Sequence, residues 1–481
     1  MAETNLKHKA AHGLLWGGIS NGIQQLLGVV FGIFLARILN KTDYGMVGVL
    51  AIFTGIAAII INSGFSVALT NKKEADHKDY NAVFWFTVFV GVGLYVILFF
   101  CAPLIARFYQ QPVLTDLSRF LFLGFLFAGL GTASSTIMFK QLMVKQQAII
   151  GIISLLVSLS AGLTLALNGY AYWSIAVQMV LQVMLTSILT IVIAPWKPTF
   201  PIDFSPLKSM LPFSIKLFFT HIFLTININV FSVIFGKFYS VEQVGIYNQG
   251  QKWAWMGNQF IAGMINAVTQ PLLVHVNEDQ GRQVNVLRKL IRFSAFLSFP
   301  LMLGLAFVGR EFILITIGEK WLSSVPFLQL FCIWGAFGFL STLYTNLIFT
   351  HGKSTIYMYG AIVIGCLQLL VVWCMYPFGI FPMVIAYLAM NFVGLLIWQF
   401  VVHKLVRLRF WDVLKDIVPY FGITLGCFAV AWFFTQNIVN VYMLMGAKIA
   451  ISGILYILIL KGTRSVIFKE SMEFLLTRKK Q

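Results

Sequence analysis

Apolar runs of about twenty residues recur along the whole chain, and short polar connections separate them. A helix of that length crosses a hydrocarbon layer of roughly 30 Å, because each helical residue adds about 1.5 Å. We therefore predict an all-α, polytopic membrane protein with about fourteen transmembrane helices. The predicted helices are 13–39, 44–70, 81–105, 116–143, 147–167, 170–194, 207–235, 241–275, 288–308, 323–350, 355–376, 379–401, 413–435 and 442–460.

A short pattern occurs twice, 200 residues apart. Residues 36–39 and 236–239 each hold a small residue, a cation and two large apolar or aromatic residues, and Gly45 and Gly245 follow. An even number of predicted helices separates the copies, which indicates two parallel halves around a central site, as in many transporters; two similar turns arising by chance are the alternative. The predicted parts are an N-terminal lobe (1–200), a C-terminal lobe (201–402), and two further helices with a basic cytoplasmic tail (403–481).

Composition supports a membrane protein and leaves no room for a soluble domain. The chain is 59% hydrophobic and 10% charged, whereas a soluble domain has roughly a quarter charged residues. If the N-terminus is cytoplasmic, 24 of the 34 lysines and arginines fall in inner connections and tails, and seven fall in outer connections. This asymmetry predicts that both termini are cytoplasmic. The net charge of +18 therefore indicates topology and contact with anionic membrane lipids, not a nucleic-acid partner.

The acidic residues indicate which chemistry is absent. All sixteen lie in connections, helix ends or tails, whereas a proton or sodium relay has a carboxylate buried in the membrane. The chain has no metalloprotease, phosphate-loop or dinucleotide-binding motif, and its five cysteines form no paired motif. We therefore expect no enzyme activity, no cofactor and no metal ion.

The cations that lie deepest within predicted helices are Lys216, Lys252 and Lys448. Lys252 lies roughly 16 Å from the outer end of its helix at 1.5 Å per residue, near the middle of the membrane. It shares a helix face with Asn248 and Gln259, which follow helical spacing. Lys448 is close to a helix end and is expected to extend to the interface, and Lys216 could do the same.

Together with polar residues of neighbouring helices, the deep cations predict a wet, cationic cavity without counter-ions. Such a cavity suits an anionic ligand such as a phosphate or diphosphate. Amides that only bond neighbouring helices, and an ordinary interfacial role for Arg37, are the alternatives. The candidate cavity residues are Asn21, Gln25, Arg37, Lys216, Asn227, Asn229, Asn248, Lys252 and Gln259.

Several segments resemble those of a known family. FLARILNKTDYGMVGV (34–49) resembles its ARxLxPxDYG segment, and NSGFSVALTN (62–71) resembles DxGxxxALxQ. VGIYNQGQKW (244–253) and GEKW (318–321) are also similar. In this order the chain resembles the polysaccharide transporter (Wzx-like flippase) family of the multidrug/oligosaccharidyl-lipid/polysaccharide exporter superfamily.

The resemblance implies two six-helix lobes around a central cavity, and alternating access across the bacterial inner membrane. The implied cargo is a polyprenyl-diphosphate-linked oligosaccharide for capsule, O-antigen or exopolysaccharide synthesis. A polysaccharide polymerase and glycosyltransferases are implied as candidate partners. One departure concerns the family's NxDxxxxxG segment, which here holds Asn227, Asn229 and Gly236. The acid has become an amide, so ion coupling at that position is not indicated.

Three other functions remain open at this point. A flippase for a cell-wall lipid precursor would use the same mechanism. A drug/cation antiporter of the same superfamily would need a buried acid. A membrane enzyme acting on lipid-linked sugars would need clustered outer carboxylates, and Glu242, Glu311 and Glu319 are not clustered in the sequence.

Overall fold

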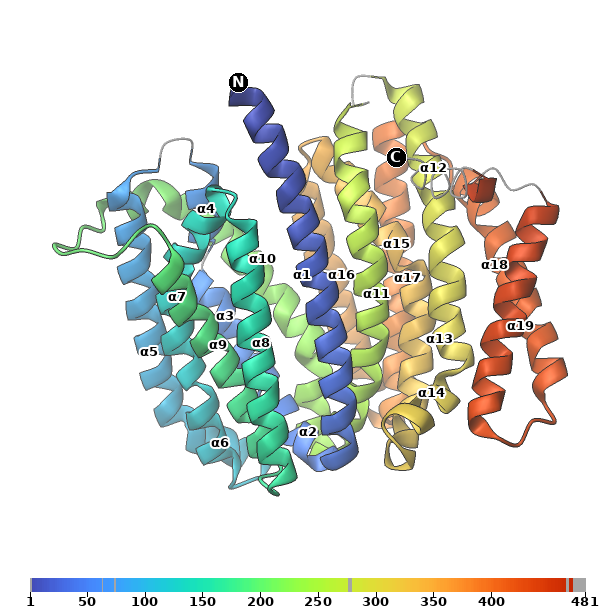
Figure 1. The fold of residues 1–481 in the computed structure, drawn as a ribbon, viewed down its shortest axis with the longest axis horizontal. Helices are drawn as coiled ribbons and strands as arrows, with labels where there is room; N and C mark the ends of the chain where they lie inside the picture. Colours follow the sequence, from blue (N-terminus) through green and yellow to red (C-terminus); the bar gives the residue numbers. More distant parts are fainter. Residues whose placement is uncertain (1, 63, 73–74, 276–278, 464–466, 470–481) are drawn as a thin grey trace. The chain divides into compact units, whose positions relative to one another are not determined.

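The computed structural model describes residues 2–62, 64–72, 75–275, 279–463 and 467–469, and these residues form helices and their connections (Figure 1). The α-helices are α1 (Ala2–Ile38), α2 (Lys41–Gly48), α3 (Ala51–Asn62), α4 (Phe65–Asn71), α5 (His77–Tyr109), α6 (Leu114–Leu121), α7 (Leu123–Lys140), α8 (Val144–Leu167), α9 (Tyr172–Ile193), α10 (Ser205–Phe238), α11 (Val241–His275), α12 (Gln280–Ser298), α13 (Gly304–Phe307), α14 (Gly309–Thr316), α15 (Val325–Thr350), α16 (Ser354–Met375), α17 (Ile380–Val406), α18 (Phe410–Thr435) and α19 (Val441–Gly462). Three short helices of other types are η1 (Phe299–Leu303), η2 (Glu319–Ser324) and η3 (Tyr376–Phe378).

The prediction of a polytopic, all-α membrane protein is confirmed. Thirteen segments of the described residues are long and apolar enough to cross a membrane. The remaining predicted span, 241–275, is present as α11 with the predicted bounds. It is absent from the thirteen, since amide side chains occur along its whole length and lower its hydropathy. This polar helix is the one on which the sequence places Lys252.

Two predicted helices are interrupted by turns in the structure. Residues 44–70 form α2, α3 and α4, and 116–143 form α6 and α7. Gly64 precedes α4 with φ of 69°, a left-handed conformation that a side chain disfavours. The apolar run continues through each break, so hydropathy alone cannot reveal that the backbone turns there.

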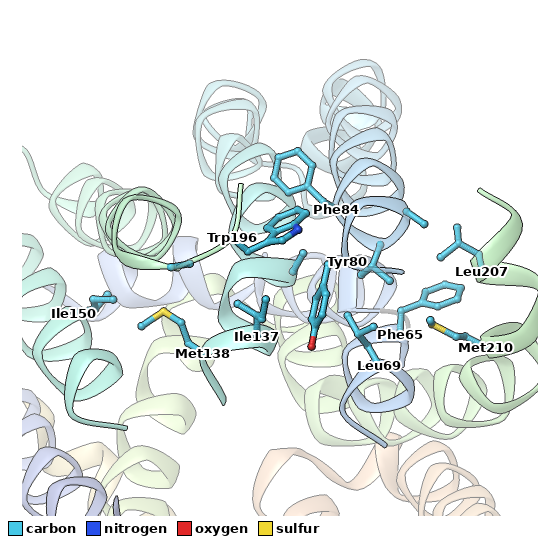
Figure 2. Close-up of a cluster of buried hydrophobic side chains, with 14 residues drawn as sticks. Phe65, Leu69, Tyr80, Phe84, Ile137, Met138, Ile150, Trp196, Leu207 and Met210 are labelled. Atoms are coloured by element: carbon cyan, nitrogen blue, oxygen red, sulfur yellow. The ribbon is translucent and has the colours of Figure 1, made fainter. Parts of the chain in front are cut away.

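The chain forms two compact units, Met1–Asn248 and Gln249–Gln481. In the first, α8 packs on α1 and α9, and α7 packs on α5 and α9. Buried side chains of α4, α5, α7, α8 and α10 form a core at one end of this unit, and Trp196 lies among them (Figure 2). The indole N–H of Trp196 donates to His77 Nδ1 at 2.8 Å, which fixes the α9–α10 connection to the start of α5. The division into lobes at residues 200 and 402 stays a prediction.

In the second unit, α18 packs on α12 and α19 packs on α14. Ion pairs tie both helices to the unit. Arg288 donates to both carboxylate oxygens of Asp416, at 2.7 and 3.1 Å. Lys448 Nζ lies 2.8 Å from Glu311 Oε1, and both side chains are largely buried. Lys448 thus reaches a carboxylate of α14, and its extension to the membrane interface stays a prediction.

Candidate functional site

The polar face of α11 is the centre of the predicted site. Lys252 Nζ lies 5.6 Å from the centroid of the neighbouring Trp253 ring. In the described part of the chain, no carboxylate forms an ion pair with Lys252. Gln259, two turns further along α11, is exposed. Both residues belong to the second compact unit, and Lys252 has no carboxylate partner among the described residues.

Three further predicted residues lie along α10 and the start of α11, in the first unit. Ser232 Oγ donates to Asn248 Oδ1 at 3.4 Å. Asn229 Nδ2 donates to the Thr225 carbonyl at 2.9 Å. Asn227 is buried. The structure thus brings Asn248 next to α10, but Asn248 and Asn229 already use part of their hydrogen-bonding capacity, on Ser232 and within α10 respectively.

The predicted residues of α1 are placed differently. Asn21 and Gln25 are exposed, and Arg37 is exposed in the last turn of α1. Gln24, between them in sequence, donates to Ser20 Oγ at 2.8 Å and packs against α8. The side chain of Lys216 lies outside the described residues. The cavity as a whole therefore stays a prediction.

The two copies of the sequence repeat meet in the first unit, where α2 crosses the first two turns of α11. A Cβ on Gly45 would lie 1.8 Å from the Val241 carbonyl oxygen, and a Cβ on Gly245 would lie 2.0 Å from that of Lys41. The contact is reciprocal, since each glycine faces the first residue of the other helix. Only glycine permits the two backbones to touch in this way. We call this contact the glycine crossing.

An ion pair spans the glycine crossing. Lys41 Nζ lies 3.3 Å from Glu242 Oε1, and both side chains are partly exposed. A pair of this kind contributes only about 0.2–1 kcal/mol. The sequence repeat identifies both glycines, but it does not predict that their helices contact each other.

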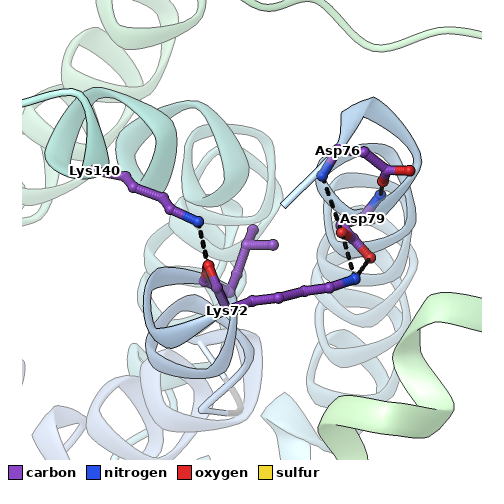
Figure 3. Close-up of polar contacts among 5 residues, drawn as sticks. Lys72, Asp76, Asp79 and Lys140 are labelled. Atoms are coloured by element: carbon purple, nitrogen blue, oxygen red, sulfur yellow. Dashed lines mark hydrogen bonds and ion pairs between the residues drawn. The ribbon is translucent and has the colours of Figure 1, made fainter. Parts of the chain in front are cut away.

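A second polar network ties helix ends together in the first unit (Figure 3). Lys72 Nζ lies 2.6 Å from both carboxylate oxygens of Asp79, at the start of α5. Lys140, at the end of α7, donates to the Lys72 carbonyl. Asp76 caps α5 by accepting from the backbone N–H of Asp79 at 3.0 Å, and this bond lowers the pKa of the Asp76 carboxyl. These bonds hold the ends of α4, α5 and α7 next to one another.

Carboxylates that are buried in the described residues all have structural partners. Asp43 accepts from the backbone N–H of Asn40 at 2.8 Å and caps α2. Asp79, Glu311 and Asp416 are ion-paired. No group of three histidine, cysteine, aspartate or glutamate side chains in the same residues could hold a metal ion. The buried acids of the described residues therefore serve the fold.

Comparisons with known proteins agree with this architecture. A family model described as "Polysaccharide biosynthesis protein" matches residues 34–326. The chain is 26% identical over 352 residues to the teichuronic acid biosynthesis protein TuaB of Bacillus subtilis (strain 168). The aligned region covers 72% of this chain and 72% of that protein. It is 24% identical over 337 residues to the lipopolysaccharide biosynthesis protein WzxC of Escherichia coli (strain K12), covering 69% of this chain and 68% of that protein.

Solved structures give the same fold. The lipid II flippase MurJ in an inward closed conformation is similar with a TM-score of 0.76 at 14% identity, over 93% of this chain and 99% of that one. An inward-facing multidrug resistance transporter of the MATE family is similar with a TM-score of 0.62, over 79% of this chain and 95% of that one. The family model spans more than half of this chain, so the protein belongs to the polysaccharide biosynthesis protein family whose motifs its sequence resembles.

Proposed function

We propose that this membrane protein moves a polyprenyl-diphosphate-linked oligosaccharide repeat unit from the inner to the outer leaflet of the bacterial cytoplasmic membrane. The transport serves capsule, O-antigen or exopolysaccharide synthesis, and both termini of the carrier are cytoplasmic. Family membership and relatives named for surface polysaccharides support the proposal. Its main structural support is Lys252, a deep cation without a carboxylate partner in the described residues. The diphosphate of the cargo would supply the missing anion.

The buried acids argue against a drug/cation antiporter. Such a carrier exchanges a proton or sodium ion at a free buried carboxylate. Here Asp43, Asp79, Glu311 and Asp416 all cap a helix or neutralise a cation. The same observation weakens the membrane-enzyme alternative, because Glu242 and Glu311 are already paired with Lys41 and Lys448.

A cell-wall lipid precursor also has a diphosphate, so Lys252 would serve that cargo equally well. The genetic setting separates the two substrates. Neighbouring genes for glycosyltransferases and a polysaccharide polymerase, the proposed partners, would favour the repeat unit. Deletion of the gene is then expected to abolish the surface polysaccharide and leave cell-wall synthesis intact.

We expect Lys252→Met to lower export about tenfold or more in a host that lacks the native gene. A charge-assisted hydrogen bond contributes about 1.5–3 kcal/mol, and 1.4 kcal/mol corresponds to a factor of ten. Lys252→Arg keeps the charge and should retain most of the export. The measurement is the amount of surface polysaccharide together with the lipid-linked saccharide that accumulates inside, normalised to membrane-inserted protein.

Lys237→Met is the matched control. Lys237 is a cation at the end of α10, and its Nζ donates to the Phe108 carbonyl at 2.8 Å. It is not one of the candidate cavity residues. Export at the wild-type level by Lys252→Met would refute the role assigned to Lys252. Normal surface polysaccharide in the deletion host would refute the proposed function itself.

A further inference from the structure

A pocket of about 520 Å³ opens on the first unit, between α4, α7 and the start of α8. Its lining includes Thr70 and Phe139, close to the ends of α4 and α7; Figure 3 shows how Lys72 and Lys140 hold these helix ends together. The lining is mostly hydroxyl and amide side chains: Ser66, Val67, Thr70, Thr132, Ser135, Thr136, Phe139 and Gln147. None of these residues has a formal charge.

The three threonines act mainly as hydrogen-bond acceptors. The hydroxyl of Thr70 donates to the Ser66 carbonyl at 2.8 Å, and that of Thr136 donates to the Thr132 carbonyl at 2.9 Å. Thr132 donates in the same way to Ala128, at 3.0 Å. Each hydroxyl proton is therefore used within its own helix, whereas the oxygen lone pairs remain available.

The remaining polar groups add further capacity. Gln147 Nε2 donates to the Ser135 carbonyl at 3.2 Å, which leaves the amide oxygen of Gln147 as an acceptor. Within the described residues, the hydroxyls of Ser66 and Ser135 have no hydrogen-bond partner. The ring of Phe139 is 59% exposed and offers an apolar surface beside these groups.

We propose that this pocket binds one or two neutral sugar residues of the lipid-linked saccharide, an inference that rests on the proposed function. Acceptors exceed donors among its side chains, so the fitting ligand presents several hydroxyl donors and no net charge. Sugars have this chemistry, and their C–H faces pack on aromatic rings such as Phe139. The volume lies in the range of about 300–1,000 Å³ typical of small-molecule pockets. A lipid acyl chain would instead leave the hydroxyls of Ser66 and Ser135 without partners.

The place of the pocket fits the loading of cargo. It adjoins the helix ends with Lys72, Lys140 and Lys145, which the charge distribution assigns to the cytoplasmic side. A saccharide that is assembled on the inner leaflet would meet this pocket before it crosses the membrane. Lys140 connects the end of α7 to the end of α4, so the two walls of the pocket are held at a fixed spacing.

Neighbouring serines on α7 provide a matched pair of variants. Ser135 lines the pocket, whereas Ser134 is fully buried outside the lining, with an unbonded hydroxyl. Thr136→Val keeps the shape of the side chain and removes its hydroxyl. We therefore compare the double variant S135A/T136V with the control Ser134→Ala in the full-length protein.

The probes are glucose, galactose, mannose, N-acetylglucosamine and their disaccharides, with binding measured by saturation-transfer NMR on purified protein in detergent micelles. We expect the wild type and Ser134→Ala to bind at least one probe with the same affinity. The double variant should bind it about tenfold more weakly, as the loss of two neutral hydrogen bonds predicts. Absence of binding by the wild type, or equal binding by the double variant, would overturn the proposal.

Export in the deletion host separates this proposal from the proposed function. If the wild type restores export and S135A/T136V exports and binds sugars normally, the sugar subsite is wrong and the transport function stands. If the wild type binds sugars through the pocket but does not restore export, the transport function is wrong and the subsite stands.

Discussion

Glu311 and Lys448 illustrate how strongly a single buried charge depends on its partner. Their side chains are 7% and 12% exposed, and 2.8 Å separates the charged atoms. Lys448 also lies 4.8 Å from the centroid of the Phe307 ring. Moving an ion out of water costs several kcal/mol, so each of these two residues compensates a cost that the other would impose alone.

We expect Lys448→Met to destabilise the protein by about 3 kcal/mol, because Glu311 would remain buried without a cation. Glu311→Gln should be similarly costly, whereas the double variant Glu311→Gln/Lys448→Met should recover much of the loss. Thermal unfolding of the purified variants in micelles measures the effect. Losses that simply add in the double variant would show that the two charges do not interact.

The sequence alone does not reveal that Lys448 has an anionic partner, whereas Lys252 has none among the described residues. Only the structure separates them, because the partner of Lys448 lies 137 residues away in the chain. Hydropathy and spacing report on neighbours along one helix. They contain no information about which residue of another helix lies opposite, so the pair of Lys448 with Glu311 could not be predicted.

At the scale of helices, the glycine crossing shows how two elements can approach to backbone contact. Gly45→Ala would place a methyl group 1.8 Å from a carbonyl oxygen, and Gly245→Ala would place one at 2.0 Å. Helix propensity alone favours alanine over glycine by up to about 1 kcal/mol. Because the two backbones must separate to admit the methyl group, we expect the crossing to outweigh this preference.

Gly45→Ala and Gly245→Ala are each expected to lower the unfolding temperature and to reduce export severalfold. Gly22→Ala is the control, since a Cβ at Gly22 of α1 has no neighbour within 4 Å. Unfolding temperature in micelles and surface polysaccharide in the deletion host are the readouts. If Gly45→Ala behaves like Gly22→Ala, the contact between α2 and α11 is not close in the membrane.

Helix bounds were predictable where an apolar run ends at polar residues. The predicted helix 241–275 has the same bounds as α11. The predicted helix 323–350 begins two residues before α15 and ends at the same residue. The break before α4 was not predictable, because Gly64 lies inside a run that remains suitable for a membrane on both sides. The pocket also had no signal, since Ser66, Ser135 and Gln147 are far apart in the sequence and each is unremarkable alone.

At the scale of the whole molecule, the exporter fold follows from composition, helix number and the motifs between residues 34 and 321, and the family match confirms it. The predicted cavity, in contrast, stays a prediction. Its predicted members are divided between the two compact units, and Asn227, Asn229 and Asn248 are partly used in packing. A helical face identifies side chains that avoid lipid, but it does not distinguish a ligand site from a polar helix contact.

Alternating access requires contacts that break during each cycle, and α11 is suited to this because it begins in the first unit and continues into the second. We expect the glycine crossing to open when the carrier faces outward. Lys41 and Glu242 lie across it, so a disulfide in K41C/E242C, in a background without the native cysteines, should lock it shut. Export should then stop on oxidation and return on reduction, while each single cysteine variant exports under both conditions. A cross-linked protein that still exports would show that transport proceeds with α2 and α11 held together.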